Sequence, residues 1–196
     1  MPLQISREDS WTLLCEWTES DSLRRHMLAV EAAMRAYARR FGEDEELWGT
    51  TGLLHDLDYE RHPSLEDGHP RYALRELEER GYPEEVVRGV ASHADFLGVP
   101  RESRMEETLY AVDELSGFLL AVAYVRPEGL HGMTPKSVKK KLKQPSFAAA
   151  VNRDDIQVGA EELGAESGMD FDQHLQFVTD ALAERADELG LGPRTG

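Results

Sequence analysis

The chain has little of several features that define other protein classes. Cys15 is the only cysteine among 196 residues, which excludes an intrachain disulfide and a zinc site built from cysteines. It follows the apolar residues Leu13 and Leu14, which indicates a buried structural thiol rather than a nucleophile. No apolar run approaches the roughly 20 residues of a membrane span, and the N-terminus lacks the pattern of a signal peptide. We therefore expect a cytoplasmic protein that does not cross a membrane.

Basic residues are also few relative to acidic ones. The sequence has 22 Lys and Arg against 38 Asp and Glu, a formal net charge of -16. This charge argues against binding along a nucleic-acid duplex, which depends on Lys and Arg, and against binding to an anionic membrane surface. The negative charge of the chain is still compatible with a small anionic substrate where bound metal ions supply local positive charge.

Strand signals are scarce, and helical spacing of apolar residues dominates the sequence. Apolar residues recur near the helical period up to Phe41, after a start capped by Asp21 or Ser22, and Gly42 predicts the end of this helix. Similar periodicity and capping signals predict further helices over residues 7–18, 44–55, 70–81, 83–93, 103–123, 134–144, 154–163 and 170–189.

This helical pattern shows no internal repeat and no clear linker. It predicts an all-α chain that forms one domain over residues 1–196. The core is expected over about residues 20–126, with a C-terminal helical extension over about residues 134–190. The chain is long enough for one domain with a proper core.

Side chains of the type that bind metals fall at core-facing positions or ends of these helices. His26 lies beside an apolar stripe, and Asp113 falls between Leu109 and Ser116 on a buried face, where a carboxylate is costly unless paired or metal-bound. Imidazole with carboxylate suits a divalent metal. Two ions about 4 Å apart can activate water for phosphoester hydrolysis. The full set is His26, His55, Asp56, His69, His93 and Asp113.

The order His26, then Leu54-His55-Asp56, then Asp113 resembles the HD-domain superfamily of metal-dependent phosphohydrolases over about residues 20–126. The resemblance implies an HD-domain helical bundle with additional C-terminal helices, in which these four residues are the core ligands. His69 and His93 resemble the further ligands of members that hold two metals. The expected cofactor is one or two divalent ions, with Mn, Fe, Co, Ni, Mg and Zn not distinguished.

Further residues are candidates for catalysis and substrate binding. Asp56 would orient a bound water or bridge two ions. Asp58 and Glu60, the acids just after the His55-Asp56 pair, are candidates for orienting water or assisting proton transfer. Lys140, in a lysine-rich helix, and Arg153 are candidates for a substrate phosphate. A solvated basic helix is the simpler interpretation of the lysines.

Three functions follow from these residues. The first is a phosphohydrolase that cleaves a small phosphate ester or nucleotide with a metal-activated water. The second, implied by a minority of similar proteins, is a di-iron oxygenase on the same scaffold. The third is a non-catalytic module that senses a nucleotide. The oligomeric state is not indicated. The remaining histidines, which lack partners in the pattern, are expected at the surface: His62, His131 and His174.

Overall fold

The computed structural model describes residues 5–193. Within that range the chain is all-helical and has no strand, which confirms the predicted fold class. Contacts divide the chain into two compact units, Met1–Leu109 and Tyr110–Gly196, so the single domain stays a prediction. The helices are α1 (Arg7–Trp17), α2 (Asp21–Phe41), α3 (Glu45–Leu54), α4 (Arg71–Glu79), α5 (Glu84–Ser92), a short 3-10 helix (Asp95–Leu97), α6 (Arg104–Tyr124), α7 (Pro135–Leu142), α8 (Arg153–Ser167) and α9 (Phe171–Ala183).

The helix ends follow the local sequence signals with small shifts. Gly42 ends α2 with a φ of 72°, a left-handed conformation that glycine adopts without steric cost. The N-cap of α2 is Ser20, whose hydroxyl accepts from the Leu23 N–H, so the predicted cap, Asp21 or Ser22, is one or two residues late. Asp44 caps α3 as predicted, accepting from two backbone N–H groups of its first turn.

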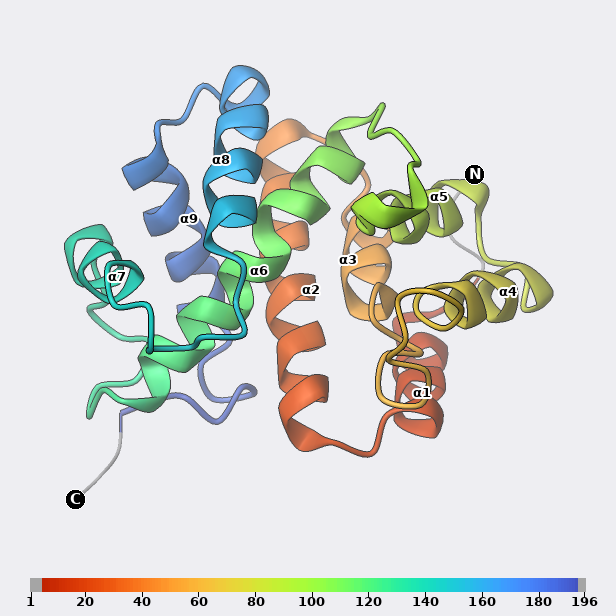
Figure 1. The fold of residues 1–196 in the computed structure, drawn as a ribbon, viewed down its shortest axis with the longest axis horizontal. Helices are drawn as coiled ribbons and strands as arrows, with labels where there is room; N and C mark the ends of the chain where they lie inside the picture. The colour runs from red at the N-terminus through yellow and green to blue at the C-terminus, as the bar shows by residue number, and fades with distance from the viewer. Residues whose placement is uncertain (1–4, 194–196) are drawn as a thin grey trace. The chain divides into compact units, whose positions relative to one another are not determined.

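In the first unit, α3 occupies the middle, because it packs on α2, α1 and α5, while α4 packs on α5 (Figure 1). Close approach of α2 and α3 depends on Gly52. A Cβ atom there would lie 2.9 Å from Met34 Cγ and 3.1 Å from the Val30 carbonyl oxygen. Both distances are below ordinary van der Waals contact, so glycine permits the helix pair to pack at this separation.

A buried ionic network ties together the first three helices. Glu31 of α2 is fully buried, and its carboxylate accepts from Arg7 Nε of α1 at 2.6 Å and from Arg35 Nε at 2.9 Å. Arg35 also donates to Glu46 Oε1 of α3 at 2.7 Å. Each buried charge therefore has a hydrogen-bonded counter-ion, without which its burial would be strongly unfavourable.

In the second unit, α9 packs on α7 and on α8, and Ala111 of α6 lies against both α8 and α9. Close packing on α6 uses Gly159 of α8, where a Cβ atom would lie 2.7 Å from Ala111 Cα. His174 of α9 is 2% exposed, and its Nε2 lies 3.2 Å from the Ala111 carbonyl oxygen, so the predicted surface position is wrong. Burial lowers the pKa of His174 to about 4, because desolvation disfavours the imidazolium. Among the described residues, no helix is long and apolar enough to cross a membrane.

Candidate metal centre

Two histidines stand at helix ends and are oriented in the same way. His55 is the C-cap of α3, and its Nδ1 lies 2.8 Å from the Gly52 carbonyl oxygen. His93 is the C-cap of α5, and its Nδ1 lies 2.5 Å from the Val90 carbonyl oxygen. Each ring thus uses a carbonyl three residues earlier, one of those that the last turn of a helix leaves unpaired. An Nδ1–H donated to that oxygen leaves Nε2 unprotonated and able to bind a metal.

Asp56 lies at the centre of the cluster, and its two oxygens face different histidines. Oδ2 is 3.5 Å from His55 Nε2 and 3.8 Å from His26 Nε2 of α2. Oδ1 is 3.4 Å from His69 Nε2 and 3.6 Å from His93 Nε2. Two groups result, each with ligand atoms within 4.8 Å of one another. The first is His26, His55 and Asp56, and the second is Asp56, His69 and His93.

The second group fits a cation on chemical grounds. His69 Nδ1 lies 2.7 Å from Asp58 Oδ1, so its Nε2, like that of His93, is left as an acceptor. The two Nε2 atoms are 3.3 Å apart, and both lie beside Asp56 Oδ1. Three acceptors this close repel one another unless a positive charge lies among them. Atoms bound to one ion at 2.0–2.2 Å are themselves roughly 3.0–3.5 Å apart, close to the spacing seen. These residues can therefore hold a divalent metal.

Asp58 and Glu60 make contacts that differ from the predicted catalytic ones. Asp58 is fully buried, with Oδ1 on His69 and Oδ2 accepting from the Ala73 N–H at 2.8 Å. Glu60 Oε2 accepts from the backbone N–H groups that precede α2, at 2.8 and 3.0 Å. Asp58 therefore stands behind His69, and Glu60 holds the connection between α1 and α2. The catalytic role of either residue stays a prediction.

The remaining predicted residues lie in the second unit. Asp113 is on α6 and half-buried, and its role as a ligand stays a prediction. Lys140 is exposed on α7, next to Lys139, whose Nζ is 2.7 Å from Asp172 Oδ2.

Arg153 begins α8, and its guanidinium group donates to backbone carbonyls. A guanidinium group has five N–H donors, and in Arg153 they go to five backbone carbonyls at 2.5 to 3.5 Å. Its Cζ also lies 5.6 Å from the ring centre of Phe118. These contacts hold the segment between α7 and α8, and the phosphate contact of Arg153 stays a prediction. The carbonyls are those of Leu142, Gln144, Phe147, Ala148 and Val151.

One residue beside the cluster was not predicted. Tyr59 is 40% exposed, and its ring centre lies 5.3 Å from that of His69 at an interplanar angle of 82°. Its place three residues after Asp56 is a signal of proximity, but the sequence does not show which way the ring points.

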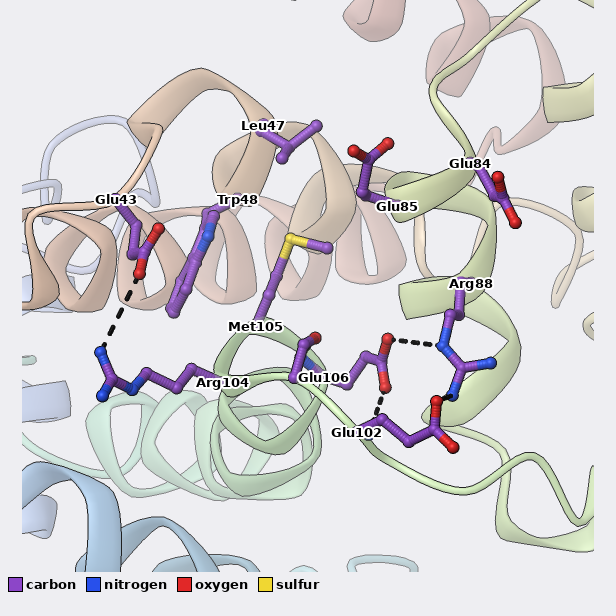
Figure 2. A pocket seen from close by; sticks show the side chains of 11 residues that line it. Glu43, Leu47, Trp48, Glu84, Glu85, Arg88, Glu102, Arg104, Met105 and Glu106 are labelled. Atoms are coloured by element: carbon purple, nitrogen blue, oxygen red, sulfur yellow. Dashed lines mark hydrogen bonds and ion pairs between the residues drawn. The ribbon is translucent and has the colours of Figure 1, made fainter.

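A separate pocket of about 610 Å³ opens in the first unit (Figure 2). It lies at the other ends of α3 and α5 from their histidines, with Trp48 and Met105 between Arg104 on one side and Arg88 on the other. Arg88 Nε donates to Glu106 Oε1 at 3.0 Å. The acids of this pocket that lie in first turns of helices complement the helix dipole. The pocket contains none of the predicted site residues.

Comparison with known families agrees with this geometry. Residues 23–117 match the family described as the HD domain, and this part of the chain is therefore an HD domain. The matched segment contains every predicted metal ligand from His26 to Asp113. No curated protein and no solved structure matches the chain at a significant level.

Proposed function

We propose that this chain is a metal-dependent phosphohydrolase that acts on a small phosphate ester or nucleotide. The observation that carries the proposal is the position of Asp56, whose two oxygens each face a pair of histidine Nε2 atoms at 3.4 to 3.8 Å. One carboxylate shared by two groups suits two ions held close together, as in centres that hydrolyse phosphate esters. The HD domain supports the hydrolase class.

Divalent ions held by these residues would stabilise charge on a phosphoryl oxygen and make a water more acidic. His26, His55, Asp56, His69 and His93 would hold them, and we propose Asp113 as a further ligand. The acidic chain repels an anionic substrate overall, so the attraction must come from charge at the centre itself.

The burial of these side chains indicates where a substrate approaches. His55 and Asp58 are fully buried and close the cluster from behind. The side chains of His26 and Asp56 are 17% and 16% exposed, so solvent reaches the cluster between them. Tyr59 is more exposed than either, and its ring lies against that of His69. The phosphate group is therefore expected to enter past His26 and Asp56.

The test is phosphate release from a panel of phosphate esters and nucleotides, with Mn²⁺, Co²⁺, Ni²⁺ or Fe²⁺ present. Wild-type protein is expected to hydrolyse at least one member, and Asp56→Ala to lose at least 100-fold in rate, because it removes a ligand from both groups. The matched control is His131→Ala, which changes an exposed histidine of the second unit. No release across the panel, with metal bound to the protein, would refute the proposal.

A di-iron oxygenase is the second candidate, because two groups that share a carboxylate are also what two irons need. Anaerobic loading with Fe²⁺ and elemental analysis separate the candidates. Two irons per chain and oxygen uptake with an organic substrate would favour the oxygenase. Fewer than two irons, or phosphate release without oxygen uptake, would remove it.

A further inference from the structure

The pocket of about 610 Å³ in the first unit has no role in the proposed function (Figure 2). Its volume falls within the range of pockets that bind small molecules. The lining comes from the starts of α3, α5 and α6 and from residues just before α3 and α6. All of these residues belong to the first unit, so the pocket is complete within it.

Trp48 brings an unused hydrogen-bond donor to this pocket. The residue is 4% exposed, and its ring centre lies 5.9 Å from that of Phe41. Within residues 5–193 its indole N–H donates to no acceptor, and the nitrogen is open to the surface rather than sealed in the core. An indole N–H can only donate, and a buried tryptophan usually finds an acceptor. Because Trp48 lines the pocket beside Met105, an acceptor atom of a bound ligand can supply that partner (Figure 2).

Both arginines of the pocket already have carboxylate partners. Arg88 Nη2 lies 2.7 Å from Glu102 Oε2, and its Nε donates to Glu106 Oε1 at 3.0 Å (Figure 2). Arg104 Nη1 lies 4.0 Å from Glu43 Oε1. An anionic ligand would compete with these carboxylates for the guanidinium groups, so the pocket does not favour an anion.

Two further carboxylates line the pocket without such a partner. Glu84 and Glu85 are exposed neighbours in the first turn of α5, and within the described part of the chain neither forms an ion pair. The start of a helix favours their negative charge, but the helix dipole does not account for the cavity or for the Trp48 donor. A positively charged ligand would be attracted to both carboxylates.

The chemistry of the lining fits an organic cation rather than a metal ion. Among the described residues, the groups of three or more ligand atoms within 4.8 Å of one another are those of the metal centre, so the carboxylates of the pocket do not converge on one point. Leu47, Trp48 and Met105 present apolar surface that a metal ion cannot use. The same surface stabilises the apolar part of an organic molecule by removing it from water.

We propose that this pocket binds a small organic amine that also carries an acceptor oxygen. The positive charge meets Glu84 and Glu85, the oxygen accepts from the Trp48 N–H, and the apolar part packs on Leu47 and Met105. The site is separate from the metal centre, because no predicted metal ligand lines the pocket. Its test therefore does not depend on the proposed function.

The experiment follows the indole N–H signals by ¹⁵N NMR while amines are added. The chain has three tryptophans, and single Trp→Phe variants at positions 11, 17 and 48 assign their signals. The probes are organic amines that carry a hydroxyl group, from ethanolamine to tyramine, with 4-hydroxyphenylpropionate as the anion matched to tyramine. At least one amine should shift the Trp48 signal to saturation, and the anion should not. The proposal is overturned if no amine shifts this signal, if the anion shifts it equally, or if Mg²⁺ does.

Glu84→Gln combined with Glu85→Gln tests the charge while keeping the size of both side chains. The affinity for the amine should fall about 3- to 10-fold, because exposed ion pairs are individually weak. The matched control is Glu78→Gln with Glu79→Gln, exposed neighbours on α4 outside the pocket, which should bind as wild type. An affinity that the Glu84 and Glu85 substitutions leave unchanged would overturn the proposal.

Removal of the acceptor oxygen tests the contact with Trp48. The tightest amine is compared by calorimetry with its analogue without the hydroxyl group, as tyramine is with phenethylamine. Wild type should prefer the hydroxylated amine, whereas Trp48→Phe, which keeps an aromatic ring but no donor, should bind both equally. Equal affinity of wild type for the two amines would overturn the assignment of Trp48.

Discussion

His174 offers a quantitative prediction, because its burial couples the stability of the second unit to pH. The ring is 2% exposed, and desolvation lowers its pKa from 6.5 to about 4. The unfolded chain therefore binds a proton more tightly at this site than the folded chain does. The stabilising effect of neutral His174 is complete above pH 6.5, is lost as pH falls from 6.5 towards 4, and changes no further below 4.

The magnitude follows from the difference between the two pKa values. The difference of roughly 2.5 units between 6.5 and 4 corresponds to about 3 kcal/mol in all. Between pH 7 and pH 5 the same linkage removes about 2 kcal/mol from the free energy of unfolding. This is a large fraction of the stability of a typical domain.

The assay is urea unfolding at pH 7 and pH 5 of wild type and of His174→Leu, which cannot titrate. Circular dichroism is the appropriate signal, because Trp11, Trp17 and Trp48 all lie in the first unit. The variant should lose less stability than wild type over this interval, by about 2 kcal/mol. His131→Leu, at an exposed position, should behave as wild type. Equal losses in wild type and His174→Leu would refute the reasoning.

Three further predictions concern close contacts, and denaturant unfolding measures each. Gly52→Ala should destabilise the chain by about 1–3 kcal/mol, because the new methyl meets the Val30 carbonyl; an unchanged midpoint would contradict this packing. Gly68→Ala should cost at least as much and should weaken metal binding, because its Cβ would lie 2.5 Å from the rigid His62 carbonyl oxygen. Arg153→Lys should lower stability by about 1–3 kcal/mol and leave the KM for substrate unchanged. A raised KM without a loss of stability would instead support the predicted phosphate contact.

Much of the helical architecture follows from short-range signals. Gly42 and Asp44 mark helix ends through backbone conformation and capping, which depend only on neighbouring residues. His55 and His93 each fall directly after an apolar helical run, so their place at a helix end can be predicted from spacing. The order of the ligand residues resembles that of one family, and this resemblance predicts that they lie together.

Other contacts could not be predicted, because they depend on partners distant in the sequence. Asp58 is predicted from the sequence as a candidate for catalysis, but its partner Ala73 lies fifteen residues further on, and no local signal indicates that contact. Arg153 is positively charged, and nothing in the sequence shows that five carbonyls surround it. His174 differs, since its spacing to Val178, also buried, carries a signal of burial that its residue type obscured.

The shared position of Asp56 has a consequence for how the effects of substitutions combine. Because His26 and His93 belong to different groups, losing both should reduce metal content by the sum of the single losses. Asp56 belongs to both groups, so adding either histidine substitution to Asp56→Ala should have little further effect. Metal content across these double variants would therefore separate one continuous centre from two independent ones, without any knowledge of the substrate.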